Sequence, residues 1–199
     1  MTKGFTTNAN NMMLTYMLEN TRFTQRGMAK ELGWNFGETV NSFVRWLEEF
    51  KQIRKTLDPE TRKPIYEVQS RGSLLKFYST FRDMNKEKLA TYKIGKNYDK
   101  VRQYISNNGG IMCLSTALQF YDDYYRDPVI NAYAENRKLL EIIPNQEEGE
   151  IQVNLYAYDF VDETRKENEI RITSPTRTIM DLYCNNMAYA AERLIEKTW

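Results

Sequence analysis

Residues 22–50, RFTQRGMAKELGWNFGETVNSFVRWLEEF, constrain the fold of this chain more than any other stretch. Their apolar residues recur three and four positions apart, which is the spacing of one face of an α-helix. Thr24 stands where an N-cap belongs and Gly33 supplies a stop, so a short helix is expected over 24–33. Asn35 can cap a longer helix, whose buried face would consist of Val40, Phe43, Val44 and Leu47. The stretch therefore predicts two helices joined by a tight turn.

A helix and a hairpin are expected on either side of this pair. Residues 10–20, NNMMLTYMLEN, have apolar side chains at helical spacing after an Asn-rich start. After the third helix, QIRKTL (52–57) and PIYEV (64–68) are β-compatible runs, and the Asp-Pro opening of 58–63 is a turn former. Three helices followed by a hairpin form a winged helix-turn-helix.

The outward face of the third helix carries side chains that can read DNA bases. Asn41 can pair with adenine, Arg45 with guanine, and Ser42 with several bases. The cations of the expected hairpin would neutralise phosphates. The candidate DNA-binding residues are Thr24, Gln25, Arg26, Asn35, Glu38, Thr39, Asn41, Ser42, Arg45, Arg54, Lys55, Arg62 and Lys63.

The charge is distributed unevenly along the chain. Residues 1–110 contain 19 Lys/Arg and 11 Asp/Glu, a balance of +8, whereas residues 111–199 contain 9 and 16, a balance of −7. A basic first half favours a polyanionic partner, here double-stranded DNA. The alternative is that the basic residues form an ordinary solvated surface on a winged helix that binds proteins.

Missing residue types exclude several functions. The chain has no histidine, so it cannot form a Ser-His-Asp or Cys-His catalytic system or a zinc site that uses histidine. Cys113 and Cys184 are far apart and fit buried free thiols. No phosphate-loop or dinucleotide-binding glycine motif is present. We therefore expect no catalytic residues, no metal and no cofactor, and in the absence of a secretory signal or a long apolar run we expect a cytoplasmic protein without a membrane partner.

The second half is expected to be a separate α+β domain. The chain is divided into a DNA-binding domain over 1–82, which ends in an amphipathic helix over 72–83, a lysine-rich linker over 83–97, and an acidic domain for partner binding or dimerisation over 98–199. Within the last, helices are expected over 98–109, 174–186 and 187–199, a strand-helix or helix segment over 111–121, and strands over 138–144, 150–161 and 169–173. The predicted fold class is thus α+β, with a winged helix-turn-helix followed by a separate α+β domain.

Two parts of the sequence resemble known protein families. Thr24, Ala29 and Leu32, followed by the pair Thr39-Val40 and by Leu47, resemble the core pattern of the winged helix-turn-helix regulators of bacteria and archaea. The segments 114–118 (LSTAL) and 172–177 (ITSPTR), with 181–182 (DL), are similar to the C-terminal domain of the AbiE-type abortive-infection antitoxins. That family implies repression of its own operon and neutralisation of a nucleotidyltransferase-like toxin. The segment 121–127, YDDYYRD, matches no feature of the family.

Local chemistry in the second half has simpler explanations than catalysis. Arg177 and Asp181, four apart, are expected to pair on the surface of their helix. Asp122 and Asp123 are adjacent and point in different directions on a helix, so a metal site there is not favoured. The tyrosines around them fit an interaction surface or a partly exposed core edge equally well.

Three hypotheses remain. The first is a DNA-binding repressor that acts as a homodimer. The second is an antitoxin that binds a cognate toxin protein, with DNA binding secondary. The third and weakest is an enzyme that processes nucleic acid, because its carboxylates form no recognisable group.

Overall fold

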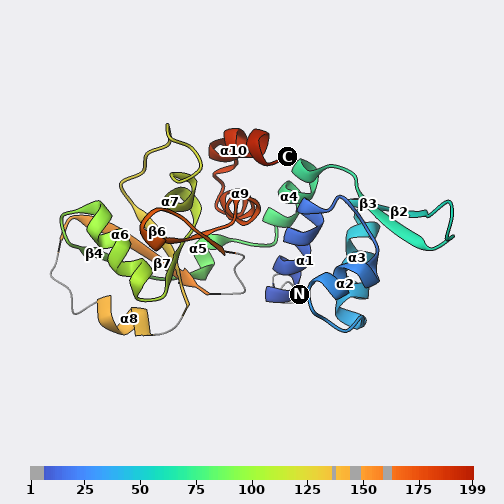
Figure 1. Cartoon of the computed structure of the whole chain (residues 1–199), viewed down its shortest axis with the longest axis horizontal. Coiled ribbons are helices and arrows are strands. Elements are labelled where there is room, and N and C mark those ends of the chain that lie inside the picture. The colour runs from blue at the N-terminus through green and yellow to red at the C-terminus, as the bar shows by residue number, and fades with distance from the viewer. Residues whose placement is uncertain (1–6, 136–137, 144–148, 159–162) are drawn as a thin grey trace. The chain divides into compact units, whose positions relative to one another are not determined.

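The computed structural model describes residues 7–135, 138–143, 149–158 and 163–199, and it shows a mixed α+β protein. The chain divides into two compact units, Met1–Arg82 and Asp83–Trp199, each with its own sheet (Figure 1). Counted by unit, the charge is less uneven than by halves, because the first unit has a balance of +5 and the second of −4. Six lysines and arginines between residues 83 and 110 belong to the second unit.

The first unit contains four helices and a three-stranded antiparallel sheet of order β1-β3-β2 among its described residues. In chain order its elements are α1 (Asn8–Glu19), β1 (Arg22–Phe23), α2 (Gln25–Glu31), α3 (Glu38–Glu49), β2 (Ile53–Leu57), β3 (Pro64–Val68) and α4 (Arg71–Ser79). The hairpin of β2 and β3 extends away from α2 and α3 (Figure 1).

The helices of this unit begin and end largely where the sequence predicts. The Thr24 hydroxyl accepts a hydrogen bond from the Gly27 N–H at 3.0 Å, and Gly33 has a φ of +70° just after α2. The expected cap at Asn35 is wrong, because α3 begins only at Glu38 and its N-cap is Gly37, whose backbone is extended. The buried face expected for α3 is confirmed, and Trp46 adds to it.

The second unit is built on a six-stranded mixed sheet of order β4-β7-β6-β5-β9-β8. Its strands are β4 (Lys88–Ile94), β5 (Gly110–Met112), β6 (Ile130–Ala134), β7 (Ile151–Ala157), β8 (Glu163–Arg165) and β9 (Arg171–Thr173). Its helices are α5 (Met84–Glu87), α6 (Tyr98–Asn107), α7 (Leu114–Leu118), α8 (Lys138–Ile142), η2 (Glu167–Glu169), α9 (Pro175–Cys184), η3 (Ala188–Ala191) and α10 (Glu192–Thr198).

The expected linker over 83–97 is wrong. These residues contain α5 and β4, and β4 pairs along its length with β7 as an edge strand of the sheet. Alternate residues of an edge strand stay exposed, which explains the run of lysines that resembled a linker.

Two other elements differ from expectation. Residues 138–144 were expected to form a strand, but Lys138–Ile142 is a helix, because a short continuous apolar run fits either structure. β6 was not expected, since Asn131 and two alanines break its apolar pattern, yet it lies at the centre of the sheet. The strand expected over 150–161 is observed as Ile151–Ala157, and residues 159–162 lie outside the described part of the chain.

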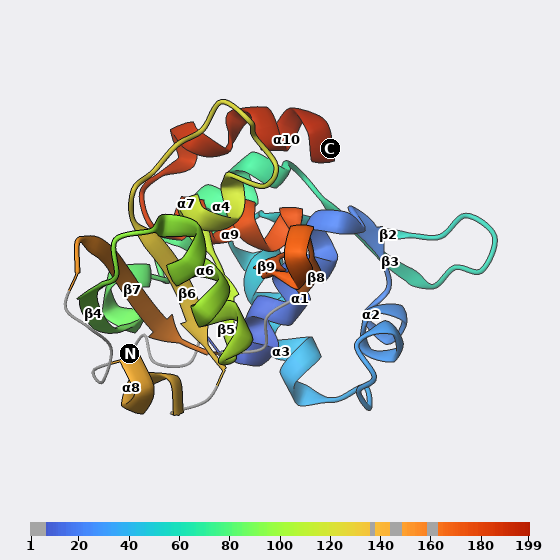
Figure 2. The ribbon, with the colours of Figure 1, turned by 60° about the vertical axis from the view of Figure 1, so that its left-hand side comes forward.

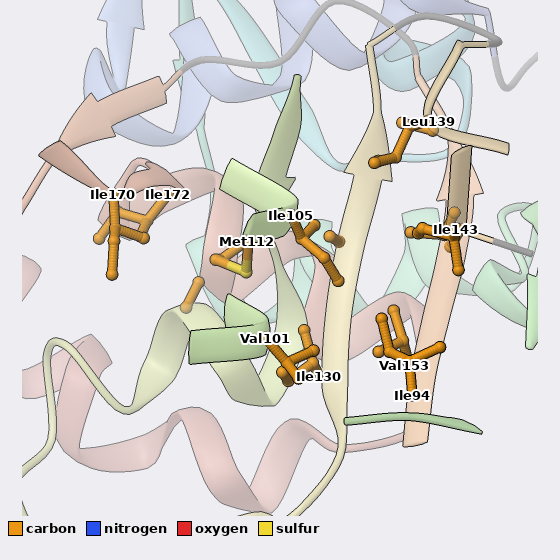
Figure 3. Packing of buried hydrophobic residues seen from close by; sticks show 14 residues of the cluster. Ile94, Val101, Ile105, Met112, Ile130, Leu139, Ile143, Val153, Ile170 and Ile172 are labelled. Carbon is orange, nitrogen blue, oxygen red and sulfur yellow. The ribbon is translucent and has the colours of Figure 1, made fainter. Parts of the chain in front are cut away.

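One face of this sheet carries the apolar core. Helix α6 lies alongside β6 and β7 (Figure 2). Its Val101 and Ile105 belong to one buried cluster with Ile130 of β6 and Val153 of β7 (Figure 3), and Leu155 of β7 belongs to the same cluster. Each fully buried aliphatic side chain stabilises the fold by about 1.5–3 kcal/mol relative to exposure. The cluster therefore ties α6 to the central strands.

The other face of the sheet is polar but also buried. Asn131 accepts a hydrogen bond from Asn154 Nδ2 at 3.0 Å and donates to the Ser115 hydroxyl at 2.8 Å. Buried polar groups are tolerated when they are hydrogen-bonded to each other in this way. This explains why both the apolar and the polar residues of β7 are buried, whereas the sequence predicted only one buried face.

The ion pair of α9 is in the interior and not on the surface as expected. Arg177 Nε donates to Asp181 Oδ1 at 2.9 Å, and Arg177 Nη2 donates to the Tyr133 hydroxyl at 2.8 Å. The expectation failed because α9 is buried on nearly all sides, polar residues included.

Candidate nucleic-acid interface

Two adjoining hollows in the first unit form one groove between α3 and the β2–β3 hairpin. Their volumes are about 570 Å³ and about 480 Å³, and Gln25, Phe36 and Tyr66 line both. We call this the α3–hairpin groove. Its lining residues are Thr24, Gln25, Arg26, Phe36, Gly37, Glu38, Asn41, Ser42, Arg45, Glu48, Lys55, Lys63, Pro64 and Tyr66.

The outward face of α3 forms one wall of the groove. Asn41, Ser42 and Arg45 are exposed there, while the opposite face of the helix is buried. The Ser42 hydroxyl donates to the Glu38 carbonyl oxygen at 2.8 Å, so its lone pairs remain available to accept hydrogen bonds from outside. Asn41 offers both a donor and an acceptor, and Arg45 offers donors only.

Cations from three elements line the groove. Arg26 comes from α2, Arg45 from α3, and Lys55 and Lys63 from the hairpin. Glu38 and Glu48 lie on the same surface, so the local balance of these groups is positive but modest. Exposed cations on opposite walls of a groove can contact phosphates on either side of a bound duplex.

The hairpin turn is held by the Asp58 carboxylate. Its Oδ1 accepts hydrogen bonds from the Thr61 N–H at 2.7 Å, the Thr61 hydroxyl at 2.9 Å and the Glu60 N–H at 3.1 Å. These bonds stabilise the charged carboxylate and lower the pKa of Asp58. The turn therefore presents Arg62, which has a φ of +58°, and Lys63 from a defined backbone.

Four of the predicted DNA-binding residues do not line the groove. Arg54 belongs to the other face of the hairpin, where its Nη2 lies 2.9 Å from Glu67 Oε2. Arg62 is exposed in the turn, beyond the groove. Asn35 and Thr39 line a separate hollow of about 280 Å³ beside the start of α3. The remaining nine, from Thr24 to Lys63, lie in the groove.

Two aromatic residues of the groove, Phe36 and Tyr66, are not among the residues predicted from the sequence. Phe36 lies in the loop before α3, is 41% exposed, and has the Arg26 guanidinium 5.8 Å from its ring centroid. Tyr66 of β3 is buried against Phe23, with ring centroids 5.8 Å apart, and burial raises the pKa of its hydroxyl. The sequence did contain a signal for Phe36. It is a large apolar residue between Asn35 and Gly37, in a segment that is too polar to form a buried strand.

Acidic and thiol side chains and long apolar helices were the remaining features to consider in the described residues. Within them, no group of three or more Cys, Asp or Glu side chains is arranged to hold a metal. Asp122, half of the adjacent acidic pair, accepts a hydrogen bond from the Tyr124 N–H at 3.0 Å and lies 3.6 Å from Arg193. No helix in the described part of the chain combines the length and the apolar character needed to span a bilayer.

Comparisons with models of protein families, with curated proteins and with solved structures give no match to this chain. The resemblances noted in the sequence therefore stay predictions.

Proposed function

We propose that the first unit is a winged helix-turn-helix that binds double-stranded DNA in a sequence-specific way. The observation that carries the proposal is the α3–hairpin groove, where base-reading side chains of α3 and cations of α2 and the hairpin line one surface. In this arrangement α3 enters the major groove and the hairpin contacts the flanking backbone.

The chemistry of the groove divides the contacts by role. Asn41 and Arg45 discriminate bases through paired hydrogen bonds, whereas Ser42 accepts from base amino groups. Lys55 and Lys63 neutralise phosphates, which gives affinity without sequence preference. Glu38 and Glu48 limit nonspecific attraction, so affinity depends on a correct set of base contacts.

A binding assay on the upstream region of its own gene tests the proposal. Fluorescence anisotropy with a labelled duplex from that region, competed by a duplex of scrambled sequence, measures specificity, and a salt series measures the number of phosphates neutralised. We expect specific binding that weakens steeply with salt. Equal affinity for both duplexes, or affinity that does not depend on salt, would refute sequence-specific DNA binding.

On this proposal the protein is a cytoplasmic repressor of its own operon, without catalytic activity, and it binds as a homodimer because paired modules read paired half-sites. Sedimentation on a duplex with two half-sites separates a dimer from a monomer. One protomer bound per half-site, without interaction between them, would contradict the dimer.

The second candidate is an antitoxin that binds a toxin protein through its second unit. Tyr124 and Tyr189 are 85% and 70% exposed, and the Arg193 guanidinium lies 5.0 Å from the Tyr124 ring centroid. Exposed tyrosine and arginine are the residue types that dominate protein interfaces. Co-purification with the product of the neighbouring gene, lost on Tyr124→Ala but kept on Lys63→Ala, would support this function independently of DNA binding.

A further inference from the structure

A second hollow, of about 380 Å³, lies within the second unit and has a polar and aromatic lining. Its walls come from α6, from the segment after α7 and from the residue after β8. We call it the Arg102 pocket, and its principal lining residues are Tyr98, Arg102, Phe120, Asp123, Arg126 and Lys166. Three cations thus line one hollow together with two carboxylates, those of Asp99 and Asp123, so its local balance is positive in a unit whose overall balance is negative.

Arg102 is held in a fixed orientation at this pocket. Its guanidinium carbon lies 4.6 Å from the Phe120 ring centroid and 5.6 Å from that of Tyr98, and its side chain is 18% exposed. Nη2 donates to Asp99 Oδ1 at 2.8 Å. A guanidinium has five N–H donors. Within the described residues, the bond to Asp99 is the hydrogen bond that Arg102 donates. The buried Nε of Arg102 has no hydrogen-bond partner among those residues. The group is therefore positioned and has donors to spare.

The other two cations are exposed at the rim. Arg126 donates from Nη1 to the Tyr125 carbonyl oxygen at 2.7 Å, and Lys166 Nζ lies 5.0 Å from the Tyr121 ring centroid. Neither forms an ion pair with a described residue. Both cations therefore remain outside any ion pair of the described residues.

We propose that the Arg102 pocket binds the phosphate group of a small molecule. A tetrahedral phosphate dianion presents oxygens in several directions and can meet cations from three elements, whereas a carboxylate presents two oxygens in one plane. The volume is that of a small-molecule site. Asp99 and Asp123 at the same hollow disfavour a long polyanion, so this site is separate from the DNA groove.

Calorimetric titration of the full chain tests the proposal with two phosphate probes. Inorganic phosphate and adenosine monophosphate distinguish free phosphate from a phosphate monoester, while adenosine and acetate serve as controls without a phosphate group. We expect binding of at least one phosphate probe at low salt and weaker or no binding of the controls. Adenosine bound as tightly as its monophosphate, acetate bound as tightly as phosphate, or no phosphate binding at millimolar concentration would overturn the proposal.

Variants then locate the site. Joint replacement Arg126→Ala and Lys166→Ala, at exposed positions, should weaken phosphate binding about fivefold. Asp123→Asn removes a repelling carboxylate and should strengthen it about twofold. Arg102→Lys keeps the charge but loses the planar fork and should weaken binding, with circular dichroism checking the fold.

Two control variants separate this site from the rest of the protein. Arg193→Gln removes an exposed cation of the same unit outside the pocket, and Lys63→Ala removes one from the α3–hairpin groove. Both should bind the phosphate probe as the unchanged protein does. Loss in Lys63→Ala but not in the Arg126/Lys166 variant would assign the binding to the groove and overturn the proposal. DNA binding is measured separately, so failure of one proposal leaves the other standing.

Discussion

An arginine and a carboxylate stand four residues apart on α3 and again on α9. On α3, Arg45 Nε lies 3.9 Å from Glu49 Oε1, and the two side chains are 77% and 65% exposed. On α9, Arg177 Nε lies 2.9 Å from Asp181 Oδ1, and the side chains are 2% and 0% exposed. The sequence spacing is identical, so the surroundings of each helix create the difference.

The difference decides what each arginine can do. Water screens the pair on α3, so the pair contributes little to stability and Arg45 can leave it for another partner. The pair on α9 has lost its hydration, and Arg177 compensates with a further hydrogen bond to Tyr133. Arg45 is thus available to a ligand, whereas Arg177 is part of the fold of the second unit.

Replacement of Arg177 should give the largest effect. Arg177→Ala removes the guanidinium that lies 2.9 Å from the buried Asp181 carboxylate, and we expect a loss of about 3–5 kcal/mol in the free energy of unfolding. Urea denaturation followed by circular dichroism measures it, and two separate transitions would show which unit is weakened.

A double variant sharpens this test. Arg177→Met with Asp181→Leu removes both charges at similar volume and should restore most of the stability. Arg45→Ala is the matched exposed control and should change stability by less than about 0.5 kcal/mol. If Arg177→Ala and Arg45→Ala lowered the free energy of unfolding equally, burial would not distinguish the two ion pairs.

Replacement of Arg45 should change DNA recognition instead. On the proposed function, Arg45→Ala removes a base contact worth about 1–3 kcal/mol of discrimination. Anisotropy on the specific and the scrambled duplex should show the preference shrinking while affinity for the scrambled duplex changes less. Glu49→Gln frees Arg45 from its weak pair and serves as the control that keeps the guanidinium. An unchanged preference in Arg45→Ala would exclude a base contact.

The contrast also shows how far the sequence predicts the structure. The helical periodicity of 24–50 marks α2 and the buried face of α3, because those residues follow a local rule of spacing. The outward residues of α3 follow from the same rule, which is why the exposure of Asn41, Ser42 and Arg45 is predictable from the sequence. The sequence could not show that α9 is buried on nearly all sides, since that depends on strands distant in the chain.

The α3–hairpin groove also depends on structure that the sequence does not reveal. Lys55 and Arg54 are neighbours in β2 and look equivalent in the sequence, yet only Lys55 lines the groove. Which of two alternating faces is turned toward α3 depends on the register with β3, where Lys55 pairs with Tyr66. Phe36 was missed because nothing in a loop sequence fixes the direction of an isolated aromatic ring.

The two hairpin cations Lys63 and Arg54 should differ in their effect on DNA binding, and both effects should be smaller than that of Arg45. Lys63→Ala should weaken binding about equally on the specific and the scrambled duplex and reduce the salt slope by about 1. Arg54→Ala removes a cation that already pairs with Glu67, so its effect on the slope should be smaller. Anisotropy at several salt concentrations measures both, and a larger effect of Arg54→Ala would assign the phosphate contacts to the other face of the hairpin.

The smallest expected effect concerns Asp58, which holds the turn without contacting the groove. Its lowered pKa means that its hydrogen bonds stabilise the turn across the neutral range and are lost only as pH falls through that lowered pKa. NMR titration should place the midpoint of the Asp58 carboxyl below the ordinary range of aspartate.

At neutral pH, Asp58→Ala should speed hydrogen exchange at the Glu60 and Thr61 amides, because it removes the acceptor of their hydrogen bonds. The control Glu60→Gln keeps the backbone donor of residue 60 and should not speed exchange. Because the same turn presents Lys63, the variant should also weaken DNA binding slightly, and by less than Lys63→Ala. A stronger effect on binding than on amide exchange would mean that Asp58 acts on DNA by some route other than the shape of the turn.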